Sequence, residues 1–210
     1  MTGRTLTAEH ALAWTGRFTE AVRRGGEELT ELDRRAGDGD FGTNMRFALR
    51  RVADLLDGGA PDSAAGVFTA LSEGFLQTGG TSGPLFGMWF REFAKGSAGG
   101  EVTTAVLARA AAAAVATVQR LGGAEVGHKT MVDAMAPAVE ALRAEADRDA
   151  EVAEALSRAA AAAREGAEST RHLVAVRGRA SYVGEHARGV VDPGALTVAL
   201  FFEAAPEPDA

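Results

Sequence analysis

The chain has 210 residues, of which 46% are hydrophobic and 24% charged, a composition typical of a globular domain with its own core. It contains no cysteine, which excludes disulfides and thiolate metal sites, and its net charge of -7 argues against broad nucleic-acid binding. The first residues lack a signal-peptide pattern and no apolar run reaches membrane-spanning length, so we expect a single cytoplasmic domain over residues 1–210 without a membrane partner.

Apolar residues recur at helical spacing in nearly every long segment, and prolines stand where the first turn of a helix tolerates them. The expected helices are Ala8 to Arg24, Glu27 to Arg35, Asn44 to Leu56, Pro61 to Leu76, Pro84 to Phe93, Val102 to Leu121, Thr130 to Ala146, Val152 to Glu168, Thr170 to Arg188 and Pro193 to about Ala204. No strand alternation of convincing length occurs. The sequence therefore predicts an all-α domain of about eight helices, followed by a short acidic tail.

A carboxylate-rich loop follows the first helical segments. Asp33, Asp38 and Asp40 fall close together, with glycines separating or flanking them. Such carboxylates repel one another unless a cation lies among them, and hard oxygen ligands suit magnesium or calcium. An EF-hand fits poorly, because Thr43 and Leu49 occupy the positions that require glycine and glutamate. The alternative is a plain turn, since Gly-Asp-Gly-Asp is also good turn and helix-start chemistry.

The second informative segment is Thr-Gly-Gly-Thr-Ser-Gly-Pro-Leu at residues 78–85. Successive glycines free backbone N–H groups for a ligand, and the helix that follows presents a partly positive N-terminus, so a phosphate would suit this place. A simple interhelical turn is the alternative. If consecutive helices run antiparallel, this loop and the acidic loop fall at the same end of the bundle, because two helices separate them.

Two later segments carry weaker signals. Residues 122–130 imitate a phosphate-binding Walker loop, but His128 occupies the required lysine position and a helix precedes it, so a P-loop is rejected. Lys129 is either a local cation or a solvated lysine at a helix start. Arg179 has the chemistry to stack on a base or pair with phosphate, whereas Asp192 before Pro193 fits a plain helix cap equally well.

Taken together in this order, the segments resemble the L subunit of dihydroxyacetone kinase, a module that also forms the C-terminal domain of single-chain dihydroxyacetone kinases. The matching stretches are Leu32–Met45, Gly79–Leu85, Gly127–Ala138 and Gly178–Ala195. The resemblance extends over essentially the whole chain. It implies an eight-helix antiparallel barrel or bundle, with a nucleotide site formed by loops at one end.

The resemblance also implies a role for each matching residue. Asp33, Asp38 and Asp40 would hold two magnesium ions that bridge the phosphates of ADP or ATP. The residues implied to bind the nucleotide are Phe41, Asn44, Gly79, Gly80, Thr81, Ser82, Leu85, Gly127, Met131, Arg179, Asp192 and Pro193. No catalytic residue is implied beyond this metal and phosphate site.

The resemblance implies a phosphotransferase that works only with a partner: a K subunit that holds the ketose on a histidine. In one version, an M subunit of a phosphotransferase system recharges the bound ADP. Phe41, His128 and Val190 stand where the family usually has His, Asp and His. These departures leave an alternative, a nucleotide-binding regulatory or adaptor subunit without catalysis. A purely structural helical domain, with aspartates as caps, is the third interpretation.

Overall fold

The computed structural model describes residues 4–182 and 184–205, and these residues form eight α-helices and four short 3-10 turns without a strand. The α-helices are α1 (Ala8–Ala36), α2 (Phe41–Asp57), α3 (Ala64–Leu76), α4 (Ser82–Gly96), α5 (Thr104–Gly122), α6 (Val132–Ala146), α7 (Val152–Ser169) and α8 (Pro193–Glu203). The 3-10 turns are η1 (Ser97–Gly99), η2 (Thr170–His172), η3 (Arg179–Tyr182) and η4 (Gly184–Ala187). The all-α prediction is confirmed. The end of the expected acidic tail lies outside the described residues.

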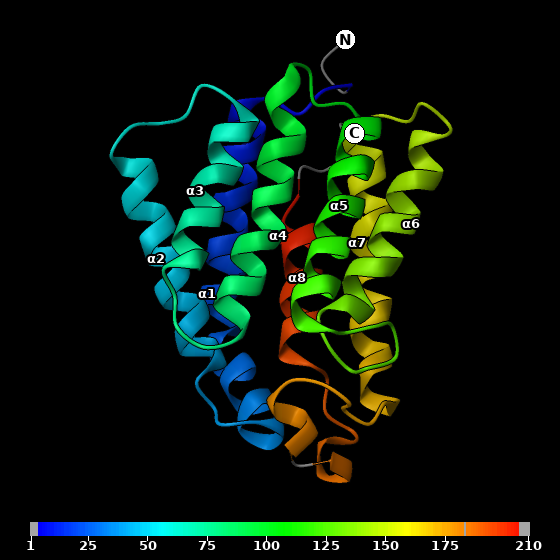
Figure 1. Cartoon of the computed structure of the whole chain (residues 1–210). Coiled ribbons are helices and arrows are strands. Elements are labelled where there is room, and N and C mark those ends of the chain that lie inside the picture. Colours follow the sequence, from blue (N-terminus) through cyan, green and yellow to red (C-terminus); the bar gives the residue numbers. More distant parts are fainter. Residues whose placement is uncertain (1–3, 183, 206–210) are drawn as a thin grey trace.

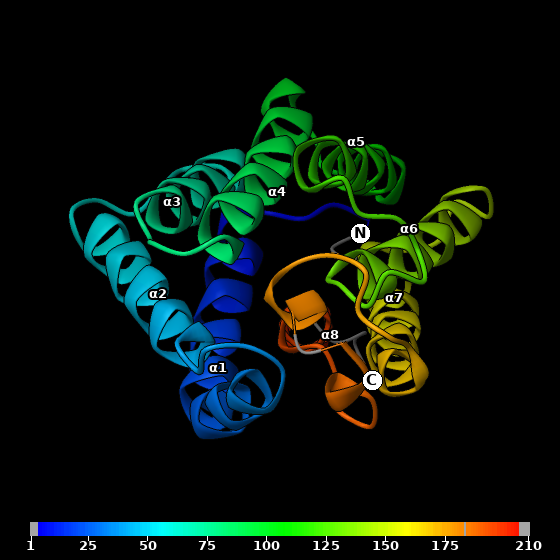
Figure 2. The ribbon, with the colours of Figure 1, turned by 60° about the horizontal axis from the view of Figure 1, so that its bottom comes forward.

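The helices form a closed ring rather than a stack of layers (Figure 1). Neighbours along the chain from α3 to α8 pack against each other, α8 also packs against α1, and α1 packs against α3, which closes the ring. Helix α2 lies outside the ring, against α1 and α3, and Figure 2 shows α8 near the middle of the end-on view. Because the helices alternate in direction, the loops before α2, α4, α6 and α8 gather at the lower end in Figure 1.

Aromatic side chains fill the interior of the ring. Trp14 of α1 stacks on Phe201 of α8 with ring centroids 4.4 Å apart, and its indole N–H donates a 2.6 Å hydrogen bond to the Phe201 carbonyl. Trp89 and Phe90 of α4 lie edge-on to Phe201 at 5.0 and 5.2 Å. The ring is therefore a filled core, and the space for a ligand lies at its end rather than along its axis.

The expected break between Arg24 and Glu27 is wrong: α1 runs unbroken for 29 residues. Gly26 lies within α1, at the place where α2 crosses that helix. A side-chain carbon on Gly42 of α2 would collide with the Gly26 carbonyl and with Thr30. The glycines at this crossing allow two backbones to approach closely; they do not end a helix.

The expected helix from Thr170 to Arg188 is also wrong. The chain from 170 to 187 contains the turns η2, η3 and η4, and no α-helix runs through its described residues. Gly178, Gly184 and Gly189 have φ angles of 69°, 55° and 84°, a region that side chains of L-residues rarely adopt. The ends of this segment meet, because the Gly189 N–H donates a 2.8 Å hydrogen bond to the Arg171 carbonyl. We call the described residues of this segment, 171–182 and 184–189, the C-terminal loop.

Several helices begin at other residues than expected. Helix α3 begins at Ala64, three residues after Pro61, because the Ser63 hydroxyl accepts a hydrogen bond from the backbone of its first turn. Helix α2 begins at Phe41 rather than Asn44, and α4 begins before Pro84. Both of the latter helices thus start directly after the acidic and glycine-rich segments. Among residues 4–182 and 184–205, no helix combines the length and hydropathy that a bilayer span requires.

Candidate functional site

A cavity of about 170 Å³ opens at the lower end of the ring, and residues of all four sequence motifs line it. Of the predicted site residues, those that line it are Asp33, Asp38, Asp40, Phe41, Gly80, Thr81, Ser82, Leu85, Met131, Arg179, Asp192 and Pro193. Asn44, Gly79 and Gly127 are not among its lining residues. The antiparallel arrangement therefore brings segments that are distant in sequence to one place, as the spacing of the loops predicts.

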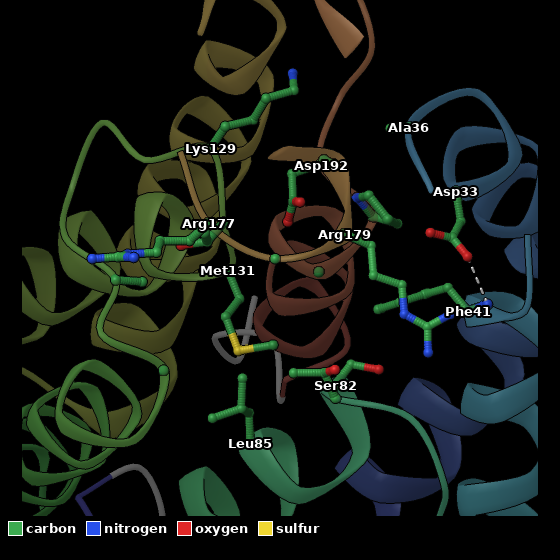
Figure 3. A pocket seen from close by; sticks show the side chains of 18 of the residues that line it. Asp33, Ala36, Phe41, Ser82, Leu85, Lys129, Met131, Arg177, Arg179 and Asp192 are labelled. Carbon is green, nitrogen blue, oxygen red and sulfur yellow. Dashed lines mark hydrogen bonds between the residues drawn. The ribbon is translucent and has the colours of Figure 1, made fainter. Parts of the chain in front are cut away.

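Three carboxylates converge on one side of the cavity. Asp33 lies on the last turn of α1 and is buried, whereas Asp38 and Asp40 lie on the exposed loop before α2. One carboxylate oxygen from each of the three lies within 4.8 Å of the others. Asp33 is held in place by a 3.0 Å hydrogen bond from the Phe41 N–H, which Figure 3 draws as a dashed line. The chemistry of this donor set fits a hard divalent cation.

Arg179 reaches the same carboxylates from the C-terminal loop. Its guanidinium forms an ion pair with Asp38 and lies 3.6 Å from Asp40. Figure 3 shows this side chain directed toward Phe41, on the acidic side of the cavity. The positive charge of the arginine offsets part of the electrostatic repulsion among the carboxylates.

The glycine-rich turn before α4 forms another wall of the cavity. Gly80 has a φ of 79°, and a side chain there would press on the Asn44 amide, which lies 3.1 Å from the position of its first carbon. Asn44 of α2 therefore lies beside this turn. Thr81 is the N-cap residue of α4, yet its side chain makes no capping hydrogen bond. A phosphate oxygen near this helix start would find backbone donors and a favourable helix dipole.

The turn before α6 is fixed by Asp133. One of its carboxylate oxygens accepts a 2.5 Å hydrogen bond from the Gly127 N–H and the other a 2.7 Å bond from the Thr130 N–H. Gly127 is thus held at the base of the turn, with a φ of 91°. His128 does not cap α6; its ring nitrogen accepts a 3.1 Å bond from the Glu125 N–H. The turn presents Met131 to the cavity, and Figure 3 shows Met131 facing Leu85 of α4.

Lys129 also lines the cavity. From the sequence, its role is either a local cation or a solvated lysine, and the second interpretation is wrong. Its side chain is only 1% exposed. Its ammonium donates 2.5 Å hydrogen bonds to the carbonyls of Thr170 and Val190. Burial lowers the pKa of Lys129 despite the nearby carboxylates of Asp192 and Asp133. Only the rarity of lysine in this chain sets it apart in the sequence, which holds one other, Lys95.

Asp192 and Pro193 close the cavity at the start of α8. The Asp192 carboxylate accepts a 2.7 Å hydrogen bond from the Ala195 N–H, so it is the N-cap of α8, with Pro193 in the first turn. Burial raises the pKa of Asp192 to about 7, although the Ala195 N–H and Lys129 oppose the shift. Asp192 therefore combines the cap role with a place on the cavity wall, where Figure 3 shows its carboxylate.

Comparisons with known proteins identify relatives of this chain. The model of the DAK2 domain matches residues 35–207. The ADP-binding subunit DhaL of PEP-dependent dihydroxyacetone kinase 1 from Listeria innocua is 34% identical over 95% of this chain and 96% of its own length. The corresponding Escherichia coli subunit is 34% identical over 94% of this chain and 95% of its own.

A solved structure shows the same arrangement of helices. The crystal structure of the dihydroxyacetone kinase from C. freundii in complex with AMP-PNP and Mg²⁺ has a TM-score of 0.71 and 28% identity, and the match covers 96% of this chain. It covers 34% of the C. freundii chain, so the similarity is to one part of that larger kinase. The helical arrangement of this chain is therefore shared with part of a dihydroxyacetone kinase.

Proposed function

Because the chain belongs to the DAK2-domain family, we propose that it is the magnesium-nucleotide-binding subunit of a dihydroxyacetone-type ketose kinase. The observation that carries the proposal is the meeting of the Asp33, Asp38 and Asp40 carboxylates with the Gly80–Ser82 turn around one cavity. Its relatives from Listeria innocua and Escherichia coli are named as ADP-binding subunits, and their lengths match this chain almost completely.

In this proposal each wall of the cavity has one task. The three aspartates would hold magnesium, with two ions expected, and the bound metal would supply charge neutralisation for the nucleotide phosphates. The turn at Gly80 and the start of α4 receive the phosphates, with Thr81 and Ser82 as hydroxyl donors. Leu85, Met131, Asp192 and Pro193 line the rest of the cavity, and the apolar side chains of Leu85 and Met131 would form the surface for the base.

The ketose itself is proposed to arrive on a separate K-type subunit. The described residues that line the cavity include no histidine, which is compatible with a ketose attached to a histidine of a partner subunit. Two routes supply the phosphoryl group: exchange of bound ADP for ATP, or recharging of bound ADP by an M-type phosphotransferase subunit. We expect a soluble cytoplasmic complex in either case.

The alternative function is a nucleotide-binding regulatory subunit without catalysis. Two observations favour it: the buried apolar side chain of Phe41 lies on the cavity wall, and the side chain of Val190 is buried against Ala36 and Ala187. Neither residue offers the polar group that a family histidine would place there. Both functions require that the cavity bind a nucleotide.

Two measurements separate these functions. Calorimetry with Mg-ADP tests the binding that both share, and absence of binding would leave only a structural role. Turnover of dihydroxyacetone is then measured with the chain alone, with a K-type subunit alone and with both. The kinase proposal expects product only from the mixture. Tight Mg-ADP binding without turnover in the mixture would favour the regulatory subunit, and robust turnover by the chain alone would contradict the division of labour.

A further inference from the structure

The Lys129 ammonium bonds to both ends of the C-terminal loop. Its two carbonyl partners, Thr170 and Val190, directly precede and directly follow residues 171–189. A buried ammonium is costly unless its N–H groups are hydrogen bonded, so these two bonds hold the ends of the loop around one charge. In Figure 3 the Lys129 side chain extends away from Met131 and Leu85, so the ammonium does not point toward the apolar wall of the cavity.

Further hydrogen bonds fasten the loop to the same region. The Asp192 N–H donates a 2.9 Å bond to the Thr170 hydroxyl, which ties the two ends of the loop together again. The Val176 N–H donates a 3.2 Å bond to the His128 carbonyl, next to Lys129. The Arg177 side chain donates a 3.0 Å bond to the Gly123 carbonyl. The loop therefore rests on residues 123–129, with Lys129 as the buried charge at its base.

The same loop carries Arg179 to the carboxylates of Asp38 and Asp40. The loop consists of short turns and contains glycines with positive φ, and no α-helix supports it. Its shape therefore depends mainly on the hydrogen bonds that attach it to the rest of the protein. The position of Arg179 in the acidic cluster is thus set by where the ends of the loop are held.

We propose that Lys129 is a positioning residue for the nucleotide site: it fixes the ends of the C-terminal loop and thereby the place of Arg179 among the carboxylates. The effect on affinity rests on the function proposed above, whereas the coupling between Lys129 and Arg179 exists without nucleotide. Two of the three N–H groups of the Lys129 ammonium bond to backbone carbonyls at the ends of the loop, so the proposed action of Lys129 is through the loop.

A thermodynamic cycle tests how Lys129 acts. Mg-ADP affinity is measured by calorimetry for the wild type, Lys129→Met, Arg179→Ala and the double variant. Each single variant should bind roughly ten- to a hundredfold more weakly, the scale of one charge-assisted hydrogen bond, and the double variant no more weakly than Arg179→Ala. Fully additive losses would overturn the proposal, because Lys129 would then act independently of Arg179. Lys95→Met, on an exposed lysine paired with Glu92, is the matched control and should bind normally.

A second measurement needs neither nucleotide nor a stable Lys129 variant. The chain has just two lysines, so amine acylation followed by mass spectrometry compares buried Lys129 with exposed Lys95 in one sample. Arg179→Ala should speed acylation of Lys129 several-fold and leave Lys95 unchanged, since the loop loses its hold on the carboxylates. Arg188→Ala, in the same loop but paired with Glu185, should change neither rate.

The acylation result is separate from the proposed function. An unchanged Lys129 rate in Arg179→Ala, or an equal increase in Arg188→Ala, would overturn the coupling even if Mg-ADP binds tightly. An increase confined to Arg179→Ala would support the coupling even if the chain bound no nucleotide at all.

Discussion

The backbone N–H of Phe41, the first residue of α2, donates a 3.0 Å hydrogen bond to the carboxylate of Asp33 on the last turn of α1. One of the three clustered aspartates therefore has a structural task before any ligand arrives. Asp38 and Asp40 are exposed and pair with Arg179. Asp33 therefore supports the fold in addition to lying in the acidic cluster, whereas Asp38 and Asp40 are exposed members of that cluster.

We predict that Asp38→Asn and Asp40→Asn each abolish magnesium-dependent nucleotide binding and leave the melting temperature of the metal-free protein nearly unchanged. Exposed ion pairs contribute little to stability, so loss of the pair with Arg179 should cost at most about 1 kcal/mol. Asp33→Ala should lose binding and also about 1–3 kcal/mol of stability, because the Phe41 N–H loses its buried acceptor. Calorimetry and thermal melts in EDTA measure both effects. A sharp drop in melting temperature for Asp38→Asn and Asp40→Asn would point instead to structural turn residues.

We predict that Gly42→Ala destabilises the protein by about 1–3 kcal/mol, because the added methyl group meets the Gly26 carbonyl and Thr30 where α1 and α2 cross. The matched control is Gly16→Ala in α1, where nothing lies within 4 Å of the added carbon. Alanine there should stabilise the protein by about 0.5–1 kcal/mol through helix propensity. Urea unfolding compares the two variants, and equal effects of the two would contradict the tight crossing.

We predict that Phe41→His strengthens Mg-ADP binding by roughly tenfold or more, since an imidazole can donate a charge-assisted hydrogen bond to phosphate where a phenyl ring cannot. Phe41 is 8% exposed and belongs to the core, so the variant should melt at a lower temperature. Phe41→Leu, which adds no donor, is the control for the loss of the ring. Calorimetry decides the outcome: unchanged or weaker binding by Phe41→His would show a site adapted to phenylalanine.

We predict that Asp192 makes stability depend on pH. Burial raises its pKa to about 7 in the folded chain, above the ordinary value of 3.8, so the folded chain holds this proton more tightly than the unfolded chain. The contribution is therefore fully present below about pH 4 and is lost as the pH rises to about 7. Asp192→Asn should lose less stability between pH 5 and pH 8 than the wild type, measured by urea unfolding. The exposed variant Asp54→Asn is the control, and an Asp192→Asn profile parallel to the wild type would contradict this prediction.

The sequence predicted the candidate site best where residue chemistry and helix direction determine which segments meet. The acidic loop and the glycine-rich turn meet because two antiparallel helices, α2 and α3, separate them. Asp192, weighed as a plain cap or a site residue, is the N-cap of α8 and also lines the cavity. The roles of these residues toward a nucleotide remain predictions.

Other features could not be predicted because they depend on contacts between distant segments. The helical continuity of α1 through Gly26 reflects the close approach of α2, which local propensity does not reveal. The segment from Thr170 has the composition of a helix, yet its ends are joined by the hydrogen bond between Gly189 and Arg171. The buried Lys129 ammonium donates hydrogen bonds to two carbonyls that lie 41 and 61 residues further along the chain, so local sequence could not reveal its environment.

The distribution of aromatic residues gives the protein two separate optical probes. Both tryptophans, Trp14 and Trp89, are buried in the core beside Phe201, so their fluorescence reports the integrity of the helical ring. The one tyrosine, Tyr182, belongs to the turn that begins at Arg179 and is 89% exposed. Unfolding of the ring and movement of the turn beside the cavity are therefore distinguishable by spectroscopy in the unlabelled chain, without an added dye.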